Sequence, residues 1–137
     1  MNFTKDYIEL CKDKRIQELR SELKNFDYCI VIETKNIGLY KDFKMIACLP
    51  TDKGFHSINR EMFLFLPNGD QLDEEIIKIC KENMWGYETI FEYQTYYLKV
   101  FEIDDRANDI TNNVCNDNPL IAKIKLLIQL LGKENQW

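Results

Sequence analysis

The length, composition and charge of this 137-residue chain exclude several classes of protein. With 45% hydrophobic and 30% charged residues, it has the composition of a globular protein rather than a disordered one, and we expect a single domain spanning residues 1–137. It contains no apolar stretch near the roughly 18–20 residues that span a bilayer, and its first residues are too charged for a signal-peptide core. We therefore expect a cytoplasmic protein that does not contact a membrane.

The amino-terminal half is expected to hold one helix and three strands. Apolar residues recur at helical spacing from Thr4 to Lys24, with a break near Asp13 that divides this helix into two pieces. Residues 26–34 are β-branched and aromatic and predict a central strand, because both of its faces are apolar. After a turn at residues 36–38, alternation of apolar residues predicts a second strand over 43–49, and residues 62–66 form a third.

The most regular segment is residues 60–86, where a strand, a turn and a helix follow one another. Pro67-Asn68-Gly69 is a turn signal, and Asp70 begins a helix that we expect to end at Gly86 in a left-handed cap. Its apolar stripe is Leu72, Ile76, Ile79, Cys80 and Met84.

The carboxy-terminal half is expected to hold a long strand segment, a polar loop and a final helix. Residues 87–103 have strand composition but are too long for one strand, so we expect a bulge or turn near Tyr93–Thr95. Residues 104–116 have loop composition, and Asn118 and Pro119 begin a helix over Leu120–Leu131. The elements together predict an α+β fold, with a mainly antiparallel sheet of four to five strands and three helices: amino-terminal, central and carboxy-terminal.

The final helix is apolar around most of its circumference. Such a helix is either deeply buried or half in contact with another chain. For the second alternative, an interface in a homo-oligomer or with another partner, the interface residues are Leu120, Ile124, Leu127 and Leu131.

Acidic residues concentrate in the middle of the chain. Residues 61–117 carry thirteen acidic and four basic side chains, an imbalance that argues against a nucleic-acid binder. The simpler interpretation is a solvated acidic face. The alternative is a patch for a protein partner with a basic face, formed by Asp70, Asp73, Glu74 and Glu75.

No set of residues predicts catalysis, a metal site or a cofactor with any specificity. His56 is the only histidine, the five cysteines form no C-x-x-C pair, and glycine-rich phosphate motifs are absent. Glu33 and Lys35 are spaced as in many metal-dependent nucleases, and Glu102, Asp104, Asp105 and Asp109 form an acidic group at a strand end. A solvated surface is the simpler interpretation of both.

Aromatic residues in the Tyr-rich segment provide one further candidate site. Tyr93, Tyr96 and Tyr97 are candidates for stacking on a nucleotide or another small ligand. The segment holds a single basic residue, Lys99, so core packing and cross-strand tyrosine pairs are the simpler interpretation.

Three blocks carry a resemblance: Tyr7–Arg20 (YIELCKDKRIQELR), Leu66–Leu72 (LPNGDQL) and Pro119–Leu131 (PLIAKIKLLIQLL). In them the chain resembles small uncharacterised proteins encoded by bacteriophages and prophages. The resemblance implies an accessory protein of the bacterial cytoplasm, of a kind that binds and blocks a host protein such as a defence protein, and it transfers no functional residue. Our first hypothesis is thus a non-enzymatic protein-binding or oligomerising module. The alternatives are a small-ligand or nucleotide binder and a metal-dependent nuclease.

Overall fold

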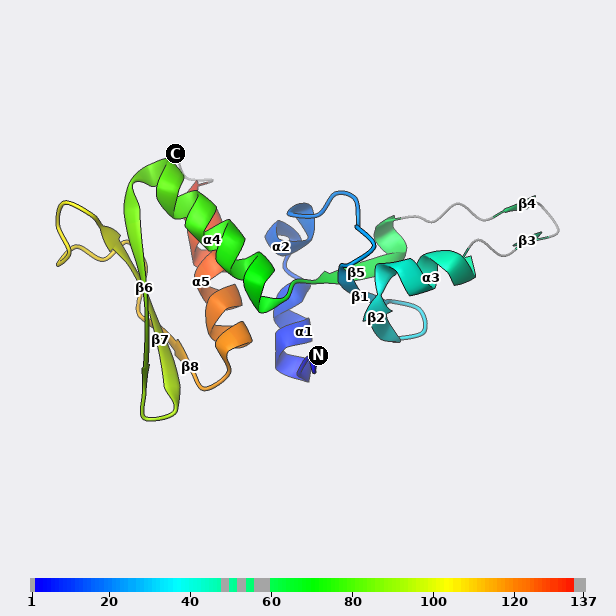
Figure 1. The fold of residues 1–137 in the computed structure, drawn as a ribbon, viewed down its shortest axis with the longest axis horizontal. Coiled ribbons are helices and arrows are strands. Elements are labelled where there is room, and N and C mark those ends of the chain that lie inside the picture. The colour runs from blue at the N-terminus through cyan, green and yellow to red at the C-terminus, as the bar shows by residue number, and fades with distance from the viewer. Residues whose placement is uncertain (1, 48–49, 52–53, 56–59, 135–137) are drawn as a thin grey trace. The chain divides into compact units, whose positions relative to one another are not determined.

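The computed structural model describes residues 2–47, 50–51, 54–55 and 60–134. The chain divides into two compact units (Figure 1). Unit 1 comprises Met1–Leu10 and Asn68–Trp137, and unit 2 comprises Cys11–Pro67. The single domain stays a prediction.

Unit 1 is a three-stranded antiparallel sheet with helices packed on it. The sheet has the order β6-β7-β8, from Trp85–Glu92, Thr95–Glu102 and Val114–Asn116. Helices α4 (Gly69–Asn83) and α5 (Pro119–Glu134) pack against each other and against these strands on one face of the sheet (Figure 1). Helix α1 (Lys5–Cys11) begins in unit 1, where Tyr7 is fully buried.

Local hydrogen bonds define both ends of α4. Asn68 and Gln71 form a capping box, in which each side-chain oxygen accepts a hydrogen bond of 2.9 Å from the other residue's backbone N–H. The helix ends at Met84, whose φ of 58° is left-handed, so the predicted cap at Gly86 is wrong by two residues. Gly86 lies in β6 instead, where an added Cβ would be 2.5 Å from the Phe101 ring.

The core of unit 1 lies between the helices and the sheet. The predicted stripe of α4 is confirmed for Leu72, Ile76, Ile79 and Cys80, all of which are buried, whereas Met84 is 71% exposed because it is the cap. The sheet and α5 supply the other large, fully buried aliphatic side chains, which are Leu98, Val100, Ile124, Leu126, Leu127 and Leu130.

Unit 2 is built on a second three-stranded antiparallel sheet. Its order is β2-β1-β5, from Ile37–Leu39, Tyr28–Val31 and Phe63–Leu66, so the first predicted strand is central as expected. Helix α2 (Lys14–Glu18) and a 3-10 turn (Arg60–Met62) precede β1 and β5. A separate two-stranded ladder pairs β3 (Pro50–Thr51) with β4 (Gly54–Phe55).

The strand predicted over residues 43–49 is wrong. Residues Tyr40–Ala47 form helix α3, in which Tyr40, Phe43 and Ala47 have helical spacing between polar residues. Phe43 packs 3.2 Å from the position that a Cβ on Gly38 would take, and its ring centroid is 6.3 Å from that of Phe63. Phe43 and Ala47 belong both to the alternating pattern of the sequence and to this helical pattern. Packing on β2 and β5 decides in favour of the helix.

Other expectations are confirmed or refined. The helix break near Asp13 is confirmed, because Asp13 caps α2 by accepting a hydrogen bond of 2.9 Å from the Arg15 N–H. The Tyr-rich segment forms two strands with a turn between them, and the carboxy-terminal end of the polar loop contains β8. The α+β class and antiparallel pairing are confirmed. In the described parts of the chain, however, the strands fall into three separate sheets and the helices number five, where one sheet and three helices were expected.

Candidate functional site

The candidate site is the tip of the β6–β7 hairpin. The two strands pair without interruption from Trp85–Glu102 to Glu92–Thr95. The turn consists of Tyr93 and Gln94, whose φ angles are 52° and 60°. Positive φ at both central residues is what a two-residue type I′ turn requires, and Asn-Gly is its preferred sequence. A tyrosine and a glutamine in these conformations are strained.

The base and the tip of the hairpin differ in burial. At the base, Trp85, Leu98 and Val100 are buried on the face that α4 and α5 cover. From Glu88 to Gln94 every residue is exposed. The helices therefore cover only the base, and both faces of the tip contact solvent.

The tip carries a group of exposed apolar and aromatic side chains. Phe91 is 61% exposed and Tyr93 is 88% exposed, and their neighbours Ile90 and Tyr97 each expose more than two fifths of their surface. Phe91 and Tyr96 pair across the strands with their ring centroids 4.6 Å apart. We call the residues Ile90, Phe91, Tyr93, Tyr96 and Tyr97 the aromatic tip.

The three tyrosines that sequence reasoning selected thus lie together, but on a projecting surface. Tyr93 occupies the turn, Tyr96 is half-buried against Phe91 and Tyr97 lies on the opposite face of β7. Two pockets described in this structure are lined by other residues. Ligand stacking by these tyrosines stays a prediction.

The predicted acidic patch lies in the first turns of α4. Asp70 and Glu74 are exposed and Glu75 is half-buried. The Asp73 carboxylate forms a salt bridge of 2.9 Å with Lys123 Nζ and lies 3.4 Å from the Tyr87 hydroxyl. Its charge is therefore compensated within unit 1. Burial raises the pKa of that Tyr87 hydroxyl. We therefore expect a partner with a basic face to contact Asp70, Glu74 and Glu75 rather than Asp73.

The predicted α5 interface is partly occupied by the protein's own core. Ile124 and Leu127 have no exposed surface, whereas Leu120 and Leu131 are half-buried. An oligomer interface on this helix stays a prediction.

The remaining sequence candidates lie in a turn of unit 2 and in a loop of unit 1. Glu33 and Lys35 are exposed in the turn between β1 and β2, and Lys35 has a φ of 61°. In the acidic loop, Asp109 pairs with Lys99 at 3.2 Å and Asp105 Oδ1 accepts a hydrogen bond of 3.2 Å from the Ala107 N–H. In the part of the chain that the structure covers, no three His, Cys, Asp or Glu side chains are grouped to hold a metal ion. His56 lies outside the described residues.

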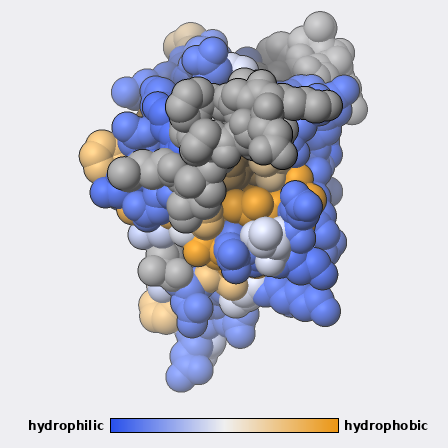
Figure 2. Space-filling view, turned by 90° about the vertical axis from the view of Figure 1, so that its right-hand side faces the viewer, coloured by the Kyte–Doolittle hydropathy of each residue, from blue (hydrophilic) through white to orange (hydrophobic). Residues whose placement is uncertain are grey.

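Unit 2 also exposes apolar side chains, among them Phe26, Ile32, Ile37 and Met62. Figure 2 shows a face on which hydrophobic side chains gather within a hydrophilic surround.

Comparisons with protein-family models, curated proteins and solved structures found no match to this chain. The resemblance to phage and prophage proteins therefore stays a prediction. Among the described helices, none is both long and apolar enough to cross a membrane.

Proposed function

We propose that this protein is a non-enzymatic binding module that contacts a protein partner through the aromatic tip. The observation that carries the proposal is the turn itself: Tyr93 is 88% exposed at a φ of 52°. A non-glycine residue in this conformation costs about 1 kcal/mol or more, and Asn at this position would cost less. An exposed tyrosine adds nothing to the core that offsets this cost, so its presence in the turn favours a role in contact with another molecule.

The composition of the aromatic tip supports a protein partner. Tyrosine and phenylalanine supply large contact areas at low entropic cost and are enriched at the centres of protein interfaces. The tip presents them on both faces of a hairpin whose base is held in the core. Such an arrangement inserts into a groove more readily than it encloses a small ligand.

Charge supports a partner with a basic face. Unit 1 contains fifteen Asp and Glu against eight Lys and Arg. Glu88 and Glu92 are exposed on β6 beside the aromatic tip, and Asp70 and Glu74 are exposed on α4. Complementary charge accelerates association and excludes wrong partners more than it adds affinity.

The test compares Tyr93→Asn with Phe26→Ser, a matched control that removes an exposed aromatic ring from unit 2. Each chain is immobilised and incubated with a cell extract, and retained proteins are identified by mass spectrometry. We expect a partner that the wild-type and Phe26→Ser chains retain and that Tyr93→Asn loses. Thermal melting should show Tyr93→Asn to be as stable as the wild type or more stable, because Asn tolerates positive φ.

A second copy of this chain is the other partner to test, in line with the predicted homo-oligomer. Light scattering at two protein concentrations measures the mass, and self-association through the aromatic tip should disappear in Tyr93→Asn. The proposal is wrong if Tyr93→Asn retains every partner, or if the wild type binds no protein and is monomeric at both concentrations.

A further inference from the structure

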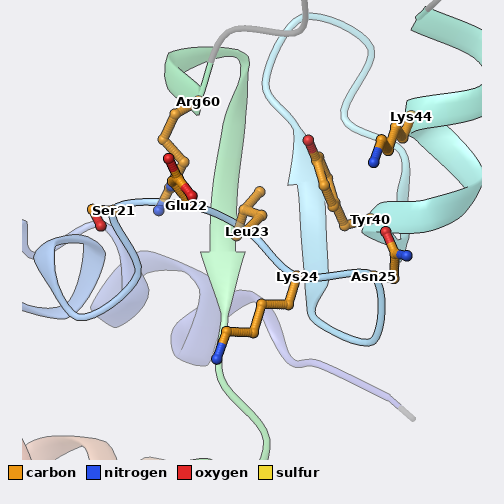
Figure 3. Close-up of a pocket in the computed structure, with 8 residues that line it drawn as sticks. All are labelled: Ser21, Glu22, Leu23, Lys24, Asn25, Tyr40, Lys44 and Arg60. Carbon is orange, nitrogen blue, oxygen red and sulfur yellow. The ribbon is translucent and has the colours of Figure 1, made fainter.

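A pocket of about 450 Å³ lies in unit 2, outside the region that the proposed function uses. Its volume falls in the range of small-molecule sites. Eight residues line it (Figure 3): Ser21, Glu22, Leu23, Lys24, Asn25, Tyr40, Lys44 and Arg60. Three of the eight are cationic and one is anionic.

A buried carboxylate holds two walls of this pocket. Asp27 is 2% exposed, and its Oδ2 accepts hydrogen bonds from the Lys24 N–H at 2.9 Å and from Arg20 Nε at 3.1 Å. The Asp27 carbonyl accepts the Tyr40 N–H at 2.9 Å, and its own N–H donates to the Lys24 carbonyl at 2.9 Å. Hydrogen bonds therefore connect both the loop of residues 21–25 and the start of α3 to Asp27.

Arg60 contributes a positive charge that is anchored by neutral groups. Its guanidinium donates to the carbonyls of Arg20 and Phe63, both at 2.8 Å, and to the Gln17 side-chain oxygen at 3.0 Å. Among the described contacts, none of its hydrogen-bond acceptors is a carboxylate. Burial lowers the pKa of Arg60, but guanidinium remains charged at neutral pH.

A second cation lies on the other side of the pocket. In Figure 3, Arg60 and Glu22 are on one side, Tyr40 and Lys44 are on the other, and Leu23 lies between them. The ammonium of Lys24 is directed away from Lys44 and Arg60 in this view. Neither lysine forms an ion pair with a described residue.

We propose that this pocket binds a small phosphate-bearing anion, with Lys44 as the main contact to the phosphate. Lysine acts as a point charge toward phosphate, and the Tyr40 hydroxyl supplies a hydrogen-bond donor on the same side of the pocket. Arg60 adds a fixed positive field from the opposite side. The Tyr40 ring, held edge-on to Phe63 at a centroid distance of 5.4 Å, and Leu23 provide an apolar surface for an organic group.

Calorimetric titration of the full chain with ADP and, separately, with pyrophosphate tests this proposal. We expect saturable binding of at least one of them that weakens about tenfold in Lys44→Met. Glu22→Gln should bind about threefold more tightly, because it removes the carboxylate that repels the anion. Tighter binding of ADP would assign an organic phosphate, and binding of pyrophosphate alone a free inorganic anion.

Lys41→Met is the matched control, because Lys41 lies on the same helix, is exposed and does not line the pocket. It changes the net charge as Lys44→Met does and should leave the affinity unchanged. The proposal is overturned if neither anion binds saturably, or if Lys41→Met weakens binding as much as Lys44→Met does. Melting curves that match the wild type show that each variant is folded.

Discussion

The two units use different interactions to hold their cores. In unit 1, α4 and α5 bury long aliphatic side chains against a sheet, and Leu72, Ile76, Ile124 and Leu127 have no exposed surface. In unit 2, polar groups link segments that are distant in sequence. Gln17 both accepts the Phe65 N–H at 2.8 Å and donates to the Phe65 carbonyl at 3.0 Å, and Arg60 bonds to Gln17.

This difference reflects how much apolar surface each unit can bury. Unit 2 has short elements: its strands have four residues at most, and α2 has five. Its ladders and helices therefore leave part of the backbone N–H and C=O groups without a hydrogen bond. Side chains such as Arg60 and Gln17 bond to the remaining carbonyls. Unit 1 has longer elements that satisfy their own backbone, and it therefore depends on aliphatic packing.

The largest expected effect is on the core of unit 1. Ile76→Ala should lower the free energy of unfolding by about 2–5 kcal/mol, because it opens a cavity at a fully buried position. Ile77→Ala is the matched control on the same helix, since Ile77 is 42% exposed, and should cost less than about 1 kcal/mol. Urea denaturation measures both, and similar losses for the two variants would contradict the assigned faces of α4.

The next effect concerns the polar contacts of unit 2. Arg60→Met should cost about 2–4 kcal/mol, because it leaves the part-buried carbonyls of Arg20 and Phe63 without this donor. Gln17→Met removes a partner of the same guanidinium. A double-mutant cycle on these two residues should show a coupling of about 1 kcal/mol or more. Strictly additive losses would show that the two side chains stabilise unit 2 separately.

Alkaline pH should weaken both units in the same way. Burial raises the pKa of Cys29 in unit 2 and of Cys80 in unit 1 from 9.0 to about 11. Below pH 9 both thiols are protonated in the folded and unfolded chains, so stability is unaffected. Between about pH 9 and 11 only the unfolded chain ionises, and stability falls by at most roughly 3 kcal/mol for each thiol.

Urea denaturation along a pH series measures this loss. Cys29→Ala and Cys80→Ala should each remove their own share of the alkaline dependence. A pH profile that neither substitution changes would refute the assignment.

The smallest effect is expected at a buried polar side chain of unit 1. Thr111 is 6% exposed, and its hydroxyl has no hydrogen-bond partner among the described residues, whereas the buried carboxylate of Asp27 accepts two hydrogen bonds. Thr111→Val keeps the shape of the side chain and removes the hydroxyl. This substitution should raise the melting temperature by an amount that corresponds to about 1 kcal/mol in the free energy of unfolding. A decrease would show that the hydroxyl forms a hydrogen bond in solution.

Local patterns predicted the elements whose chemistry is local. The turn at residues 67–69, the helix break near Asp13 and the break in the Tyr-rich segment all depend on residues within a few positions of one another. Prediction failed for α3, because its residues fit both a helical and an alternating pattern and contacts with Gly38 and Phe63 decided the outcome. It also missed β8, a three-residue strand that pairing with β7 stabilises.

The sequence by itself determined the α+β class, the amphipathic face of α4 and the concentration of tyrosines in one segment, since each follows from periodicity or composition. Only the tertiary structure decided which of these tyrosines are exposed, because that depends on how far the helices extend over the hairpin. The tertiary structure also brought together the residues that line the pocket in unit 2. Arg60 and Gln17 are 43 residues apart in sequence, and no local pattern marks a contact at that separation.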